Sequence, residues 1–165
     1  MKKIMSSWSA RNLTLLGKIA ILKSFVVSQI VYILSSLPSP PGVMKEINCL
    51  LYDFPWDSKG DKIKRREMTN EYNKGGLKMI ELQSFNESLK MKWIKGYMDN
   101  NNKWKWKSSV NHYLEKHGGK LFFSANLKRQ DTPQLNISDP LLAETVEYWS
   151  TLNFPSSQIW LNTLI

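Results

Sequence analysis

The sequence predicts a mainly α-helical protein, an irregular helical bundle that begins with a helical hairpin. Apolar residues recur at steps of three and four along several stretches, which is the period of an α-helix. Clusters of proline and glycine separate these stretches. With 165 residues, 42% of them hydrophobic, the chain is long enough to bury one core and a smaller second one. The pattern also allows a short β-hairpin between Ile63 and Met79.

The first helix is expected over residues 12–37. Its apolar residues at helical spacing are Leu15, Leu16, Ile19, Leu22, Val26, Ile30 and Ile33. Residues 38–42, which include three prolines, must end it, because proline lacks a backbone donor and disfavours a helical predecessor. A shorter helix then ends at Phe54, before Pro55. Its expected apolar face is Val43, Ile47, Leu50, Leu51 and Phe54. The two helices form an antiparallel hairpin.

Further elements follow the hairpin. Residues 57–67 are charged and predict a loop that leads into a short ordered segment, and residues 73–76 predict a turn with paired glycines. A further helix is expected to begin after Glu81, with Lys90 away from its apolar face. Its apolar residues are Leu82, Phe85, Leu89, Trp93 and Tyr97. A short helix near residues 110–114 precedes a loop at residues 130–140. A last helix begins at Pro140, capped by Asp139.

The charge is large and uneven. The chain has 23 Lys and Arg against 14 Asp and Glu, a net charge of +9. All the basic residues lie at or before Arg129, whereas residues 131–165 contain four acidic ones. This balance favours a polyanionic partner, either nucleic acid or an acidic membrane surface. We therefore expect three segments: a helical hairpin at 1–58, a basic region at 59–130 and an acidic helical tail at 131–165.

Several site types are disfavoured by the residues available. Cys49 is the only cysteine, which excludes an internal disulfide and favours an intracellular compartment, nuclear or cytoplasmic. With His112 and His117 as the only histidines, no Cys/His zinc cluster can form, and we expect no metal or other cofactor. The apolar stretch at residues 13–34 contains Lys18 and Lys23, which argue against a membrane span.

Two groups of basic residues are candidates for phosphate contacts. Arg11 and Lys18 are spaced at whole helical turns, and with Lys23 they predict a basic stripe beside the apolar one. A solvated helix face is an equally good interpretation of that stripe. The second group has five basic residues within eight, whose mutual repulsion an anion would relieve. It comprises Lys59, Lys62, Lys64, Arg65 and Arg66.

The aromatic sequence at residues 104–107 alternates tryptophan with lysine. Trp104 and Trp106 are candidates for stacking on unpaired bases, with cations between them. Tryptophan is more often part of a core, and an alternating pair needs only one ring outside. A core role is therefore the stronger of the two interpretations for these residues.

Five short strings, in order, resemble the region after the polymerase domain in reverse transcriptases of non-LTR (long interspersed element) retrotransposons. The first runs from Trp8 to Lys18 and fits W-x-x-R-x-L-[ST]-x-x-G-[KR], the start of that family's thumb. The others are Leu37-Pro38, the F-x-W at residues 54–56, the basic residues 62–65, and the string at 70–79 that contains Gly75-Gly76-Leu77. The stretches at 141–144 and 159–162 resemble the region further on. Pro55 departs from the family pattern, in which an aromatic or aliphatic residue is usual.

The resemblance implies a thumb-like segment that clamps RNA and DNA, as a hybrid template-primer or a single strand. The polymerase carboxylates of that family lie on a palm upstream, and no paired acidic residues of that kind occur here. We therefore expect no enzyme activity from this chain itself, although the parent it resembles is an RNA-directed DNA polymerase. Three alternatives stay open: a helical protein-interaction module, a membrane-associated module, or a non-functional transposon relic that associates through exposed apolar surface, with the absent palm or with other copies.

Overall fold

The computed structural model describes residues 2–9, 11–57, 59–124 and 136–152. Every regular element within them is helical, so the predicted mainly α-helical fold is confirmed. Their contacts divide the chain into two compact units, with the boundary between Asn86 and Glu87. This boundary differs from those expected at 58/59 and 130/131. Residues 159–162 and most of the expected loop at 130–140 lie outside the described residues.

The long first helix is present and contains an unpredicted π-helical turn. It comprises α2 (Leu15–Ile21), the π-helical η1 (Leu22–Val27) and α3 (Ser28–Ser36). The hydroxyl of Thr14 caps its start by accepting from the backbone N–H of Gly17 at 3.2 Å. A further helix, α1 (Lys2–Ser9), precedes it and was not predicted. α1 packs on η1, where the rings of Trp8 and Phe25 lie 5.8 Å apart.

The π-helical turn changes which side chains are buried. Ile19 before it and Leu22 at its first position are buried as expected. Each π turn takes up more residues than an α turn, so the later apolar face moves along the sequence. Leu34 is therefore buried, while Ile33, at the expected position, is 54% exposed. The expected burial of Leu16 was also wrong, because this side chain lies on the outer face of α2 and is 56% exposed.

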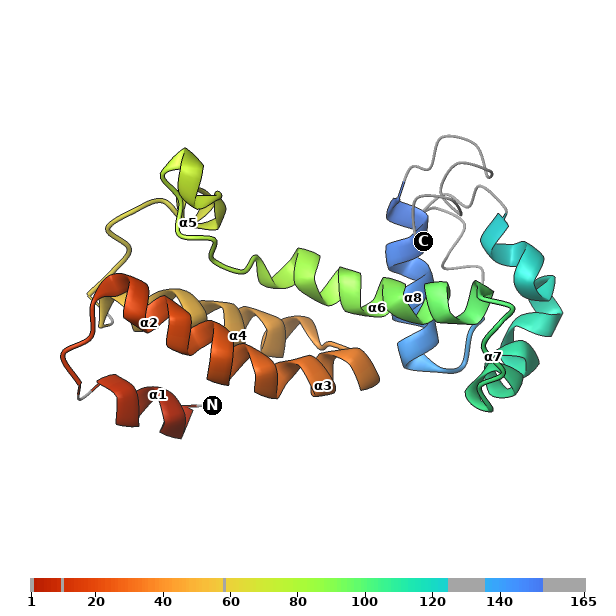
Figure 1. Ribbon diagram of the computed structural model, residues 1–165. Coiled ribbons are helices and arrows are strands. Elements are labelled where there is room, and N and C mark those ends of the chain that lie inside the picture. Colours follow the sequence, from red (N-terminus) through yellow and green to blue (C-terminus); the bar gives the residue numbers. More distant parts are fainter. Residues whose placement is uncertain (1, 10, 58, 125–135, 153–165) are drawn as a thin grey trace. The chain divides into compact units, whose positions relative to one another are not determined.

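The second arm of the hairpin is α4 (Pro41–Asp53), which continues into the 3-10 turn η2 (Phe54–Trp56). Pro41 occupies the first helical turn, where its missing N–H costs nothing. In Figure 1 α4 runs back along α2 and α3, and η2 at its end contacts α2, which confirms the predicted hairpin. Val43 is 50% exposed and Met44 is buried in its place. The buried apolar residues shared by the hairpin include Ile19, Leu22, Val26, Ile30, Leu34, Met44, Ile47, Leu51 and Phe54.

The chain reverses through α5 (Arg65–Thr69) and the 3-10 turn η3 (Tyr72–Lys74), without a β-strand among the described residues. The β-hairpin considered between Ile63 and Met79 is therefore wrong. Leu77 and Met79 both donate to the carbonyl of Met68, at 3.1 and 2.8 Å, so these bonds close the end of a helix and do not form a ladder. The paired glycines do make the predicted turn. Gly75 has a φ of 74°, and a Cβ at Gly76 would lie 2.1 Å from the carbonyl oxygen of Asn70.

The helix predicted after Glu81 is α6 (Leu82–Met98), and the boundary between the two units falls within it. Its buried residues step by four or three, through Leu82, Asn86, Lys90, Ile94 and Tyr97. Lys90 was expected away from the apolar face, and that prediction is wrong, because its side chain is completely buried. Because Asn86 and Lys90 are polar residues on the buried face, the pattern of apolar residues does not identify that face.

The second unit has its own core. α7 (Trp106–Leu114), the 3-10 turns η4 (Glu115–His117) and η5 (Gly119–Ser124), and α8 (Pro140–Thr151) pack with the later part of α6. Asp139 caps α8 as predicted, accepting from the N–H of Leu142 at 2.7 Å. The core residues are Ile94, Tyr97, Leu114, Phe122, Phe123, Val146 and Trp149. α8 thus shares a core with α6 and α7, despite the acidic charge of the tail.

One helix in the described part of the chain, Leu15–Ser36, is long and apolar enough to cross a membrane by length and composition alone. Lys18 lies within it and is buried against the rest of the hairpin. A core helix of a globular unit passes the same test of length and composition.

Candidate nucleic-acid interface

The strongest concentration of cations lies at residues 59–66, which we call the basic segment. It follows the left-handed residue Asp57 and leads into the first turn of α5. It has five basic residues and one acidic residue, Asp61. Lys59, Lys62, Lys64 and Arg66 are exposed, and Arg65 is half-buried. The predicted residues are therefore brought together in one short surface segment.

Arg65 holds the basic segment against the hairpin. Its Nε donates to Oδ2 of Asp61 at 2.8 Å, and its guanidinium lies 4.8 Å from the ring centre of Tyr52 in α4. The hydrogen bond that Arg65 donates to Asp61 raises the pKa of Arg65 above its ordinary value. Because both contacts are internal, Arg65 positions the segment more than it offers a cation to a ligand. Within the described residues, the side chains of Lys62, Lys64 and Arg66 make no hydrogen bond or ion pair, although the backbone carbonyls of Lys64 and Arg66 accept hydrogen bonds in α5.

Lys18 is held in an internal ion pair and does not face solvent. Its Nζ lies 2.5 Å from Oδ1 of Asp57, and its side chain is 9% exposed. The hydrogen bond from Lys18 lowers the pKa of Asp57, and Lys59 and Lys62 add to the effect. The predicted phosphate contact of Lys18 is therefore corrected to a structural one, because its ammonium already has a carboxylate and little access to water.

Arg11 and Lys23 do not continue a stripe with Lys18. Arg11 precedes the cap of α2, so it does not share the helical face that the spacing predicted. Its guanidinium lies 4.3 Å from the ring centre of Trp8, and its side chain remains exposed. Lys23 is half-buried in η1, with its Nζ 3.4 Å from the carbonyl oxygen of Leu77. The three residues thus have three different environments, and only Arg11 is open to a ligand.

The two tryptophans of the alternating sequence have different surroundings. Trp104 is 51% exposed, whereas Trp106 is partly buried and meets Trp93 edge-on at 4.9 Å. Trp104 lies against the backbone of α6 at Gly96, where a Cβ would be 2.9 Å from its Cζ3. Part of the Trp104 ring is therefore supported by α6, while about half of the residue is exposed. Its exposed neighbours Lys103 and Lys105 supply cations beside it.

Gly96 and Tyr52 were not predicted as part of any site. Gly96 lies inside a helix, where glycine is unfavourable relative to alanine and usually has a packing reason. That cost was a visible signal in the sequence. Tyr52 gave no such signal, because its contact with Arg65 depends on the path of the chain between α4 and α5.

The described residues contain no group of three His, Cys, Asp or Glu that could hold a metal ion. Comparison with protein-family models, curated proteins and solved structures found no match to this chain. The resemblance to retrotransposon reverse transcriptases therefore stays a prediction.

Proposed function

We propose that this chain binds nucleic acid through phosphate contacts of the basic segment and base stacking on Trp104. The observation that carries the proposal is the exposure of Lys62, Lys64 and Arg66, whose side chains make no hydrogen bond or ion pair within the described residues, on a segment that Arg65 fixes to α4. Cations held in place lose less conformational freedom on binding than cations on a flexible loop.

The expected ligand is an RNA–DNA hybrid or a single strand, which is the ligand class that the family resemblance implies. Phosphate contacts give affinity without sequence specificity, and each one releases counterions. A supported, half-exposed indole between lysines is a suitable surface for an unpaired base. We propose binding and not catalysis, as a segment that grips a substrate for a polymerase core.

The test compares binding of an RNA–DNA hybrid over a salt series. The test variant replaces Lys62, Lys64 and Arg66 with Ala. If these residues contact phosphates, the slope of log affinity against log salt becomes shallower by about two to three, since each duplex phosphate contact contributes about 0.9. Affinity at low salt falls accordingly.

The matched control replaces three other exposed lysines, Lys45, Lys92 and Lys116, with Ala. It has the same net charge as the test variant, so it shows the effect of overall charge alone. Equal losses in both variants would contradict a defined interface at the basic segment. Absence of binding by the wild-type chain at low salt would contradict the proposed function itself.

A second candidate function is association with a membrane or a protein through the apolar hairpin. Residues 24–44 contain no charged side chain, and large apolar side chains are exposed on this part of the first unit. They are Phe25, Tyr32, Ile33, Leu37 and Val43. Exposed apolar surface of this extent marks interaction sites or regions prone to self-association. This candidate predicts cosedimentation with neutral phospholipid vesicles that does not weaken at high salt, and a Tyr32→Glu/Ile33→Glu variant that stays in solution.

A further inference from the structure

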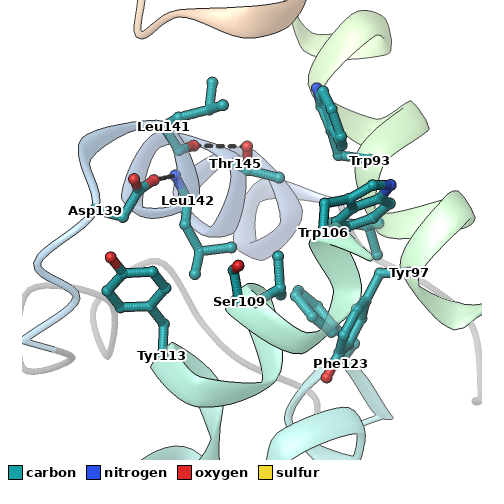
Figure 2. A pocket seen from close by; sticks show the side chains of 12 residues that line it. Trp93, Tyr97, Trp106, Ser109, Tyr113, Phe123, Asp139, Leu141, Leu142 and Thr145 are labelled. Atoms are coloured by element: carbon teal, nitrogen blue, oxygen red, sulfur yellow. Dashed lines mark hydrogen bonds between the residues drawn. The ribbon is translucent and has the colours of Figure 1, made fainter. Parts of the chain in front are cut away.

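The second unit contains an apolar cavity of about 200 Å³ between α6, α7 and α8 (Figure 2). Aromatic side chains from α6, α7 and η5 form its walls, and residues at the start of α8 form the opposite side. An apolar cavity of about 150 Å³ is large enough to bind benzene. This cavity therefore has room for a planar ring, and no part of the proposed phosphate contacts uses it.

Contacts among the wall residues fix their orientation. Trp93 and Trp106 meet edge-on at 4.9 Å, and Tyr97 and Phe123 do so at 5.7 Å. The hydroxyl of Tyr97 donates to Oδ1 of Asn111 at 2.5 Å, which holds this ring from its polar end. Aromatic rings at such angles present both faces and edges to a ligand. The cavity is thus formed before any ligand binds, and it suits a flat one.

The polar groups of the cavity are few. Its hydroxyls and indole N–H groups can donate hydrogen bonds, whereas the carboxylate of Asp139 can only accept them. Asp139 lines it, and Oδ1 of this carboxylate accepts from the N–H of Leu142 at 2.7 Å. Its other oxygen makes no hydrogen bond within the described part of the chain. Ser109 also lines the cavity from the exposed side of α7. The hydroxyl of Thr145 already donates a hydrogen bond, to the carbonyl of Leu141 at 2.7 Å.

We propose that this cavity binds one unpaired nucleobase that carries an exocyclic amine. The inference rests on the proposed function for its choice of ligand, because a nucleic acid supplies planar rings with edge donors. A carboxylate accepts from the N4 amine of cytosine, whereas it opposes the O4 carbonyl at the same position of uracil. The cavity therefore prefers cytosine to uracil, two rings of equal size and shape.

The test titrates the full chain with cytidine and, separately, with uridine, and follows the indole N–H resonances of Trp93 and Trp106. Cytidine should bind about five- to 100-fold tighter than uridine, the usual range for one good pairing of side chain and base edge. Asp139→Asn should reverse or abolish the preference. Asparagine caps a helix as well as aspartate does, so α8 is retained while the free acceptor becomes an amide.

A second variant, Ser109→Leu, fills the mouth of the cavity from an exposed helical position. Leucine favours a helix at least as well as serine, so the fold is not at risk. Binding of both nucleosides should be lost. Equal affinity for cytidine and uridine in the wild-type chain, or an unchanged preference in Asp139→Asn, would overturn the proposal.

The outcomes also separate this inference from the proposed function. Nucleosides have no phosphate, so the Lys62→Ala/Lys64→Ala/Arg66→Ala variant should bind cytidine like the wild type. Cytidine preference without salt-dependent binding of the hybrid would support the cavity and contradict the phosphate interface. Salt-dependent binding of the hybrid without cytidine binding would support the phosphate interface and contradict the cavity proposal.

Discussion

Lys18 and Asp57 form an ion pair between a buried and an exposed partner. The ammonium of Lys18 lies inside the hairpin, while the carboxylate of Asp57 is about half exposed, with a side-chain exposure of 48%. Removal of Lys18 and removal of Asp57 therefore have different effects on stability. Without Lys18, the carboxylate is hydrated by water, whereas without Asp57 the buried ammonium has lost its partner. The contact links α2 to the end of η2, and so it stabilises the hairpin that carries the basic segment.

We predict that Asp57→Asn lowers the free energy of unfolding more than Lys18→Met does. Hydrogen bonding to Lys18 lowers the pKa of Asp57 in the folded chain. The stability that this shift contributes is present above the unfolded pKa of about 3.9 and is lost as pH falls through the folded pKa. Urea unfolding at pH 7 and at pH 3 measures both effects. The difference in free energy of unfolding between the wild type and Asp57→Asn should be smaller at pH 3 than at pH 7. An equal difference at both pH values would show that the ion pair is not its source.

At the level of elements, sequence patterns predicted the helices better than their buried faces. Proline and glycine between residues 38 and 42 made the hairpin predictable, because they leave the chain few alternatives. The π-helical η1 was not predictable in this way, since no residue type requires a π turn. Its effect was to bury Leu34 and not Ile33. Lys90 was misplaced because a buried lysine is stabilised only by a tertiary partner, Glu144 in α8, 3.5 Å away.

The packing of Trp104 on α6 makes a prediction about the element that supports it. Gly96→Ala should displace the ring, because the new Cβ would lie 2.9 Å from Cζ3 of Trp104. If Trp104 stacks on unpaired bases, Trp104→Ala should weaken binding of a single-stranded oligonucleotide by about 1–3 kcal/mol. Gly96→Ala should cause part of that loss, and Trp104→Phe should cause less than Trp104→Ala. Oligonucleotide titration by fluorescence anisotropy measures all three.

The matched control for Gly96→Ala is Gly42→Ala in the first turn of α4, where a Cβ meets nothing within 4 Å. It tests whether a glycine-to-alanine change affects binding by itself. Equal affinity of the wild-type chain and Trp104→Ala for the single strand would show that Trp104 is only a packing residue. The basic segment would then carry the binding alone.

For the whole molecule, charge was a poor guide to the division of the chain. Residues 131–165 are acidic, which predicted a separate tail, yet α8 shares its core with α6 and α7. Core formation depends on apolar contacts such as those of Val146 and Trp149, and these are independent of net charge.

The candidate interface was more predictable. Clustered cations repel one another and so tend to lie at the surface, and the basic segment does lie there. The burial of Lys18 could not be predicted in this way, because it depends on Asp57, which is 39 residues away in the sequence.

Two cores in one chain predict two units that respond separately to destabilising substitutions. Gly76→Ala should affect the first unit, because its Cβ would collide with the backbone of Asn70. Glu144→Gln should affect the second, because it removes the carboxylate beside the fully buried ammonium of Lys90; loss of one partner of a buried pair typically costs about 3–5 kcal/mol. Amide hydrogen exchange of the full chain measures each unit in the same experiment.

In Gly76→Ala, exchange should accelerate in α2, α3 and α4 and stay unchanged in α7 and α8. In Glu144→Gln, exchange should accelerate in α7 and α8 and stay unchanged in α2, α3 and α4. The continuous helix α6 crosses the boundary between the units, and a helix propagates order along its length more readily than it nucleates. If either substitution accelerates exchange equally in both cores, α6 couples them into one cooperative unit. Substitutions in the second unit would then be expected to weaken phosphate binding by the basic segment as well.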